Sequence, residues 1–256
     1  LIKTCQFISS RADVAPTEYI AVLSRLQDSV PARPYSQVVA VIRGEFGKHP
    51  DELFDGFTRA PIASASLAQV HRARTKDGHD VAVKVQYPGI DRILETDLRN
   101  IAILVKILAR IEKNFDFRIM MRELNKDMPR ELDFELEGRS SERVAKDLAH
   151  RHDIRIPKVH WAETRRRVLT TEFIEATKIS DIEALLAEGI DPNQVALIMT
   201  EAYCEQILVH GFFHADPHPG NLFVLPGPVV VFLDFGLSKE LSESFRLNYA
   251  KLITAL

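Results

Sequence analysis

The most informative segment of this chain begins with His214-Ala215-Asp216-Pro217-His218-Pro219-Gly220-Asn221 and ends with Asp234-Phe235-Gly236. Two short apolar runs lie between these motifs, at residues 222–225 and 229–233, on either side of Pro226-Gly227-Pro228. Apolar runs of this length around a Pro/Gly turn predict a β-hairpin. Such a hairpin would return the chain so that Asn221 lies beside Asp234.

Three polar residues of this segment have the types and the spacing of a phosphoryl-transfer site. Asp216 and Asn221 lie five positions apart in one loop, which is the spacing of a catalytic base and a metal-binding amide. Asp234 would supply a carboxylate to the same Mg²⁺ ion, because Mg²⁺ takes oxygen ligands beside ATP phosphates. The simpler alternative is a chance D-F-G triplet with Asp216 capping a turn. Two motifs at the correct spacing around a hairpin favour the catalytic site.

Composition bounds the class of protein without naming a function. The 256 residues suffice for one large domain or two lobes, and 46% hydrophobic with 27% charged residues is ordinary for a globular protein. A net charge of -3 gives no basic field, so we expect no nucleic-acid partner. Cys5 and Cys204 are too few for a disulfide framework and lack metal-ligand spacing, so we expect no zinc. The apolar residues 101–111 are too short and too interrupted by charge to cross a bilayer.

Residues 1–53 are predicted to form a helical N-terminal extension. Apolar positions recur at helical spacing in residues 1–30, and a proline-rich joint follows at residues 31–35. Residues 36–46 form another amphipathic piece, with Ser36 as its expected N-cap.

Residues 54–174 are predicted to form a half built on a small five-stranded antiparallel sheet. The expected strands are residues 57–62, 67–74, 80–86, 154–161 and 167–174. Between the first two strands, the small residues Ala63, Ser64, Ala65 and Ser66 would let the backbone approach phosphates closely. Lys84 is predicted to project from the strand face opposite to its apolar neighbours and to contact the ATP phosphates. A merely solvated lysine is the alternative.

An acidic helical segment follows at residues 118–148, where Pro129 either starts a new helix or kinks a continuous one. Glu131 and Glu137 would lie on different helical faces and meet different partners. For Glu131 we predict an ion pair that orients Lys84. A solvated acidic face is the alternative, and we favour that alternative for Glu135.

Residues 175–256 are predicted to form a mostly helical half. Asp191-Pro192 has the residue types of a helix N-cap and first turn. The helix would end at Gly211 and lead into the loop that begins at His214. Its expected buried side consists of Val195, Ile198, Met199, Ala202, Ile207 and Leu208.

Taken together, these motifs resemble the UbiB (AarF, ABC1-type) family of atypical protein-kinase-like proteins over nearly the whole chain. The resemblance rests on the alanine-rich loop at residues 63–66, the nucleotide lysine Lys84, the E-x-D motif at residues 131–133 with the downstream Glu137, the catalytic loop and the D-F-G triplet. Lys3-Thr4-Cys5-Gln6 resembles the K-x-G-Q motif of that family, with Cys5 in the glycine position.

The resemblance implies an α+β, bilobal protein-kinase-like fold that binds ATP (or ADP) and Mg²⁺. Asp216, Lys84 and Glu131 would be catalytic, and Asn221 and Asp234 would hold the metal ion. Residues that contact the nucleotide would be Ala63, Ser64, Ala65, Ser66, Lys84, Lys3, Gln6 and Glu137. In this family the N-terminal extension covers the position where a protein kinase takes its peptide.

The resemblance also implies a cellular role. It favours ATPase activity over transfer to proteins, in support of ubiquinone or prenylquinone metabolism at a membrane. The expected partners are a membrane lipid or quinone precursor and proteins of quinone biosynthesis. Localisation would be a mitochondrion or plastid in a eukaryote and the inner membrane in a bacterium. We expect targeting and transmembrane segments to lie outside this sequence, and the helical half to continue past residue 256.

Two other functions are compatible with the catalytic loop. A small-molecule phosphotransferase of the choline or aminoglycoside kinase type has a similar H-x-D-x-x-x-x-N loop, but the helical extension and the alanine-rich loop argue against it. A pseudokinase scaffold is the other alternative. All five expected active-site residues are present, namely Lys84, Glu131, Asp216, Asn221 and Asp234, so loss of chemistry is not indicated.

Overall fold

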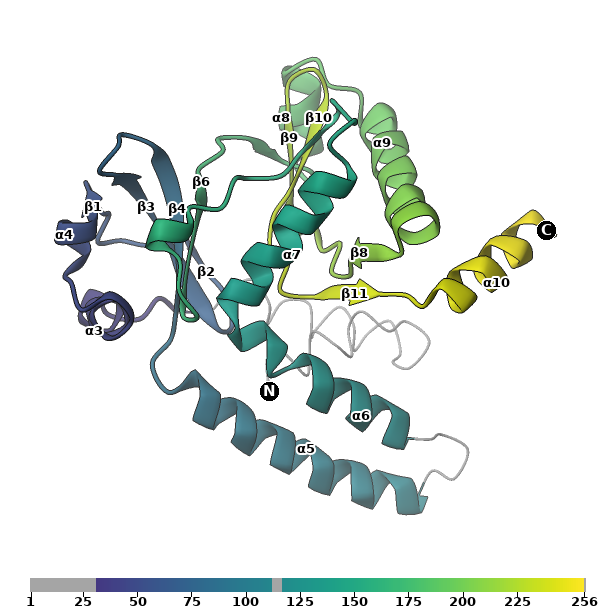
Figure 1. Cartoon of the computed structure of the whole chain (residues 1–256), viewed down its shortest axis with the longest axis horizontal. Helices are drawn as coiled ribbons and strands as arrows, with labels where there is room; N and C mark the ends of the chain where they lie inside the picture. Colours follow the sequence, from purple (N-terminus) through teal and green to yellow (C-terminus); the bar gives the residue numbers. More distant parts are fainter. Residues whose placement is uncertain (1–30, 112–116, 256) are drawn as a thin grey trace. The chain divides into compact units, whose positions relative to one another are not determined.

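A computed structural model describes residues 31–111 and 117–255 (Figure 1). The chain divides into two compact units. Of the described residues, the first unit comprises 31–111, 117–132 and 161–170, and the second comprises 133–160 and 171–255. The domain limits predicted at residues 53 and 174 stay predictions.

The first unit contains a five-stranded sheet, but the predicted strands at residues 57–62 and 154–161 are not among its members. Its strands follow the order β1–β3–β4–β6, and β2 pairs with β3 on the side of β1. The strand bounds are Phe54–Asp55 for β1, Ala63–Ser64 for β2, Ala68–Thr75 for β3, Asp80–Gln86 for β4 and Val168–Glu172 for β6. The turn at residues 76–79 joins β3 and β4, whose seven registered pairs run from Ala68↔Gln86 to Arg74↔Asp80.

Alternation along β4 separates the two faces of this sheet. Val81, Val83 and Val85 are buried, whereas Ala82 and Lys84 are half-buried. The three valines pack in a core with Val38, Val41 and Ile42 of helix α3 (Tyr35–Phe46). Burial of these apolar side chains supplies the main drive for the unit to fold, at about 25 cal/mol per Å².

Two local predictions in the first unit were wrong. Helix α3 begins at Tyr35 after Pro34, so Ser36 lies inside the helix and makes no cap. The chain before β3 runs beside it through Thr58 N–H to Arg72 O (2.9 Å) and Ile62 N–H to Val70 O (2.8 Å). The predicted strand at residues 57–62 is therefore wrong. Regular pairing with β3 occurs on either side of it, in β1 and in β2, and Pro61 has no N–H to donate to a ladder.

Helices α5 (Ile90–Ile111) and α6 (Phe117–Asp127) pack side by side. Their shared apolar cluster centres on Leu94, Leu124 and Met128. Of the two alternatives for Pro129, the kinked continuous helix is wrong, because α6 ends at Asp127 and a 3-10 turn η1 (Arg130–Leu132) follows the proline. No helix in the ranges that the structure describes has both the length and the apolar character to cross a membrane.

The second unit surrounds a four-stranded sheet of order β5–β10–β9–β7. Its strands are β5 (Ile154–Arg155), β10 (Val229–Phe232), β9 (Leu222–Leu225) and β7 (Thr177–Lys178). The β9–β10 hairpin is confirmed, with the turn at residues 226–228. The predicted strand at 154–161 is wrong, because β5 pairs in parallel with β10 and residue 159 makes only an isolated bridge.

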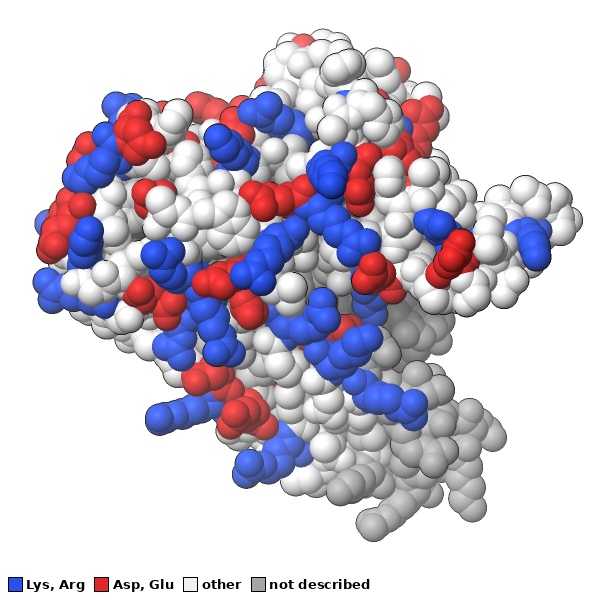
Figure 2. Space-filling view, in the orientation of Figure 1, with Lys and Arg blue, Asp and Glu red and all other residues white. Residues whose placement is uncertain are grey.

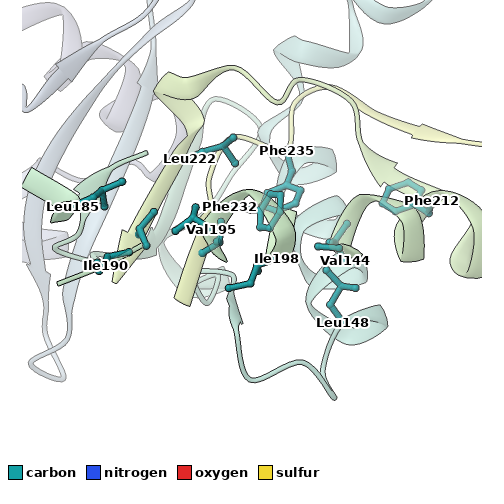
Figure 3. Close-up of a cluster of buried hydrophobic side chains, with 13 residues drawn as sticks. Val144, Leu148, Leu185, Ile190, Val195, Ile198, Phe212, Leu222, Phe232 and Phe235 are labelled. Carbon is teal, nitrogen blue, oxygen red and sulfur yellow. The ribbon is translucent and has the colours of Figure 1, made fainter. Parts of the chain in front are cut away.

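The core of the second unit receives side chains from helices α7 (Phe134–Asp147), α8 (Ile182–Ala187) and α9 (Pro192–Cys204). Helix α10 (Glu243–Thr254) follows later in the chain and has no buried residue. Figure 3 shows the core, in which side chains of α7, α8 and α9 meet Leu222, Phe232 and Phe235. A two-stranded sheet of β8 (Phe212–His214) and β11 (Ser238–Glu240) completes the unit.

Helix α9 delivers the chain to the loop at residues 214–221. Asp191 caps it by accepting from the N–H of Asn193, with Pro192 at its first position, as predicted. The helix continues as a π-helix η3 (Glu205–His210), which ends at Gly211 with φ +67°. Val195, Ile198 and Ala202 are buried as expected, but Ile207 and Leu208 are only half-buried. Gln206 takes the inward position, because it lies four residues after Ala202.

Charged side chains are mixed on the face of the molecule shown in Figure 2, where Lys and Arg alternate with Asp and Glu.

Candidate active site

Lys84 and the small-residue hairpin lie in one row of the first unit's sheet. Ala63 pairs with Val70, and Val70 pairs with Lys84. Residues in register across neighbouring strands point to the same face, so Lys84 projects on the half-exposed face beside the hairpin. Ala63 and Ser64 belong to β2, and the chain reverses at Ala65, whose N–H donates to Ala68 O at 2.8 Å. Ser66 lies within this tight reversal.

The turn that carries Glu131 is tied to the same strand as Lys84. Gln86 Nε2 donates to Leu132 O at 2.7 Å, and Gln86 lies two residues after Lys84 on β4. Glu131 is buried, with 7% of its surface exposed. The structure therefore holds the Glu131 turn at the end of the strand that carries Lys84. The predicted ion pair between Lys84 and Glu131 stays a prediction.

In the second unit, the hairpin brings Asn221 and the Asp234 segment together. Strand β9 starts directly after Asn221, and Phe232 at the end of β10 pairs with Leu222. The ladder continues past the strands, since Leu233 N–H donates to Asn221 O at 2.8 Å. The sequence prediction that the hairpin returns Asn221 to the neighbourhood of Asp234 is confirmed at the level of the backbone.

Asp216 and Asn221 contact each other within their loop. Asn221 Nδ2 donates to Asp216 Oδ2 at 3.4 Å and lies 3.5 Å from Asp216 O. A 3-10 turn at Pro219–Asn221, capped by the His218 ring, sets this separation. Because the amide nitrogen of Asn221 faces Asp216, its amide oxygen is the atom that can ligate a cation.

Asp234 has a left-handed backbone conformation, with φ +54°, and it is the one non-glycine residue with positive φ in the described ranges. Its Oδ1 accepts from Gly236 N–H at 3.2 Å, which stabilises this conformation locally. A Cβ at position 236 would lie 3.2 Å from Asp234 Oδ1 and 3.7 Å from Glu137 Oε2. The glycine thus allows two carboxylates to approach one backbone segment.

Asp133 and Glu137 both belong to the start of helix α7, but Asp133 caps the helix and Glu137 lies beside Gly236. Asp133 is the N-cap of α7 and accepts from Leu136 N–H at 3.1 Å, so the third residue of the E-x-D match starts a helix. Glu137 lies in the first turn of that helix, is 4% exposed, and lies beside Gly236. A helix N-terminus favours a nearby carboxylate in its ionised form.

His214 links the loop to the Asp234 segment, although the sequence alone gave it no role. Its Nε2 lies 3.1 Å from Leu233 O and 2.9 Å from Asp234 O, so this nitrogen carries the proton and donates. Nδ1 then accepts from Tyr203 Oη at 2.9 Å. The sequence feature that could have indicated this role is a histidine at the end of the apolar strand Phe212-Phe213-His214.

Burial fixes the protonation of this pair. It lowers the pKa of His214, against the opposing charge of Asp234, so the ring is neutral at pH 7. It also raises the pKa of Tyr203, helped by the charge of Asp216, and the hydroxyl keeps its proton. The neutral tautomer and the phenol donor are mutually consistent, and they hold the backbone carbonyl of Asp234 in place.

The donor set of the second unit suits Mg²⁺. The Asp234 carboxylate and the Asn221 amide oxygen are hard oxygen ligands of the kind that bind Mg²⁺ together with phosphate oxygens. Gly236 leaves room at Asp234 that a Cβ would fill. Lys3 and Gln6, for which the sequence predicts nucleotide contacts, lie outside the described residues.

Comparison with known proteins identifies the family. The ABC1 atypical kinase-like domain matches residues 25–256. A Xenopus tropicalis protein, AarF domain-containing protein kinase 1, is 40% identical over 260 residues, which are all of this chain and 50% of that protein. The Arabidopsis thaliana protein ACTIVITY OF BC1 COMPLEX KINASE 8, chloroplastic, is 37% identical over 252 residues, covering 96% of this chain and 33% of that protein.

A solved structure supports the same assignment. The complex of Rv3197 with erythromycin, from Mycobacterium tuberculosis, has a TM-score of 0.68 and 30% sequence identity, covering 92% of this chain and 60% of that one. The fold is therefore the kinase-like one that the motifs predict. The chain spans about half the length, or less, of these two curated relatives. It belongs to the ABC1 (AarF) family of atypical kinase-like proteins.

Proposed function

We propose that this protein binds ATP with Mg²⁺ and hydrolyses it or transfers its terminal phosphoryl group. The observation that carries the proposal is the arrangement of Asp216, Asn221 and Asp234. The Asn221 amide faces the Asp216 carboxylate, and the backbone of Asn221 is bonded to Leu233, next to Asp234. This is the set of a base and two metal ligands that phosphoryl transfer requires.

Each side chain has a distinct role in this proposal. Asn221 and Asp234 bind the cation, and Lys84 binds phosphate oxygens from the open face of β4. Glu131 orients Lys84, and Asp216 accepts the proton of the attacking hydroxyl or orients a water molecule. Bound Mg²⁺ would supply stabilisation of negative charge on the phosphates.

Several relatives are named as kinases, and one is named as chloroplastic. From these names and the motif resemblance, we infer a role in ubiquinone or other prenylquinone biosynthesis, or in membrane lipid homeostasis, at an organellar or bacterial membrane. A membrane lipid or quinone precursor is then the partner. The inference predicts that vesicles carrying a quinone-precursor mimic alter the ATP turnover of the protein, and unchanged turnover would argue against it.

Thermal-shift titration tests nucleotide binding itself. A nucleotide at 100 times its dissociation constant should stabilise the native protein by about 2.7 kcal/mol. Lys84→Ala and Asp234→Asn should each abolish the Mg²⁺-dependent part of that shift while the protein stays folded. An undiminished shift in both variants would refute the assignment.

Turnover separates Asp216 from the binding residues. Asp216→Asn should retain nucleotide affinity and lose rate, because a base or water-orienting group acts in the transition state. If affinity collapsed while turnover per bound nucleotide survived, Asp216 would be a metal ligand or a structural residue.

A further inference from the structure

Gln206 is a fully buried amide in the turn that precedes the catalytic loop. It lies in the π-helix η3 and has 0% exposure. Buried polar side chains require hydrogen-bond partners, and Gln206 has two. Its Oε1 accepts from the backbone N–H of His214 at 3.1 Å, and its Nε2 donates to Ala202 O at 3.2 Å. The side chain therefore joins the helix to the first residue of the loop.

The π-helix that carries Gln206 is anchored independently of the active site. Glu205, its first residue, lies 3.1 Å from Nε2 of both His150 and His210, and 3.7 Å from a guanidinium nitrogen of Arg151. π-helices are rare and occur frequently at functional sites. Because these contacts fix the π-helix, the backbone of Gln206 is fixed too, and its side chain can hold the loop that begins at His214.

Gln206 holds His214, which connects the catalytic loop at residues 214–221 with the Asp234 segment. The main chain of His214 begins the loop that contains Asp216, and the ring of His214 donates to the carbonyls of Leu233 and Asp234. Tyr203, three residues before Gln206, holds the other ring nitrogen. The backbone and the ring of His214 are thus both fixed from the end of one helix.

We infer that Gln206 is a positioning residue of the active site, which aligns the catalytic loop and the Asp234 segment through His214. The structural part of this inference rests on the hydrogen bonds alone. Its kinetic part rests on the proposed function. The hydrogen bond from Gln206 to the loop reaches the main chain of His214, so any effect on Asp216 or Asp234 passes through His214.

The test compares Gln206→Met with Ile198→Val in the same chain. Methionine has a similar length and removes both hydrogen bonds, and Ile198 is a buried apolar residue of α9 that serves as the matched control. We expect Gln206→Met to speed amide hydrogen exchange in residues 212–216 and 233–236, and Ile198→Val to leave both segments unchanged. We also expect kcat for ATP to fall by about 10- to 100-fold, since displacing a catalytic group by roughly 1 Å costs about 100-fold.

Binding of MgADP, followed by thermal shift, should change by less than about twofold in Gln206→Met, because the cation and phosphate ligands are retained. Gln206→Glu keeps the acceptor for His214 and should recover part of the protection in residues 212–216. Equal exchange in Gln206→Met and wild type would overturn the inference, as would unchanged kcat in an active enzyme. A wild type without ATP turnover would overturn the proposed function instead, and the exchange data would still decide the role of Gln206.

Discussion

At the scale of single residues, the backbone of Asp234 combines a functional role with a conformational cost. A left-handed conformation costs an ordinary residue roughly 1–2 kcal/mol, whereas Asn and Asp adopt it more readily through local side-chain bonds. Asp234 has φ +54° and bonds its own segment through Gly236 N–H. The carboxylate therefore holds the backbone as well as the proposed metal ion.

We predict that these two roles can be separated by substitution. Asp234→Asn keeps a side-chain acceptor and should change the free energy of unfolding by less than about 0.5 kcal/mol, whereas Asp234→Ala should lower it by about 1–2 kcal/mol. Urea denaturation measures both values. Both variants should lose Mg²⁺-dependent nucleotide binding. Equal stability of the Asn and Ala variants would show that the Gly236 bond contributes nothing to the fold.

Two buried histidines should make stability depend on pH. His71 is 0% exposed, with its ring between Gln69 Nε2 (2.9 Å) and Thr58 O (2.7 Å). Burial lowers its pKa, against the opposing Thr58 carbonyl, and burial likewise lowers the pKa of His214. Both rings are therefore held neutral in the native state, while an unfolded histidine titrates near about 6.5.

The sign follows from proton uptake. As pH falls below about 6.5, each of these histidines binds a proton in the unfolded chain but stays neutral in the native protein. The free energy of unfolding therefore decreases, by at most about 1.4 kcal/mol per pH unit for each histidine. The loss ends once pH has passed below the native pKa values. Urea denaturation at pH 7.5, 6.5 and 5.5 measures the slope. His71→Gln should flatten it, whereas replacing exposed His152 by Gln should not. An equal slope in His71→Gln would exclude His71 as a source.

Residue types and short spacings predicted some local geometry of the candidate site, and the roles of its residues stay predictions. The alternation in β4 correctly placed Lys84 opposite the buried valines, and Asp216 and Asn221, five positions apart, contact each other in their loop. Positions set by tertiary packing were not predictable. Asp133 serves as a helix cap, and the neighbourhood of Glu137 and Gly236 depends on contacts between segments about 100 residues apart.

At the scale of elements, the end of the π-helix depends on Gly211. Its φ of +67° is rarely adopted by residues with a Cβ, and the nearest atoms to an added Cβ belong to Arg246 and Leu241, at 3.5 Å. Gly211→Ala should lower the free energy of unfolding by about 1 kcal/mol. Gly44→Ala is the matched control inside helix α3, where an added Cβ meets open space, and it should raise stability by about 0.5–1 kcal/mol. Chemical denaturation of both variants checks the opposite signs, and two changes of the same sign would contradict the prediction.

Elements were predictable where a local rule governs them. Asp191-Pro192 started helix α9 and the Pro/Gly turn closed the β9–β10 hairpin, because caps and turns depend on a few adjacent residues. The partner of β5 was missed, because a two-residue strand carries no signal for pairing in parallel with a strand some 75 positions later. The buried position of Gln206 was not predicted, because the apolar residues Ile207 and Leu208 were expected to be buried, although Gln206 is the residue four positions after Ala202.

At the scale of the whole molecule, the motif resemblance includes a segment that lies outside the described residues. It predicts that Lys3 and Gln6 contact the nucleotide, and that the alanine-rich hairpin contacts the phosphates. The described hairpin is a tight reversal in which Ala65 N–H is already bonded to Ala68 O. A backbone committed to its own hairpin has less freedom to wrap a phosphate than one with glycine at that position.

This leads to a prediction about selectivity in the full chain. Ala65→Gly should loosen the hairpin and change the preference between ATP and ADP, because glycine reaches backbone angles that alanine does not. If Lys3 is a cation near the terminal phosphate, Lys3→Ala should change the same preference and raise autophosphorylation, and Gln6→Ala should act in the same direction. Lys48→Ala, at an exposed lysine after helix α3, is the control for loss of one positive charge. The measurements are competition of ADP against ATP and autophosphorylation with labelled ATP. If all three variants match Lys48→Ala in both assays, the extension and the hairpin are structural elements without a gating role.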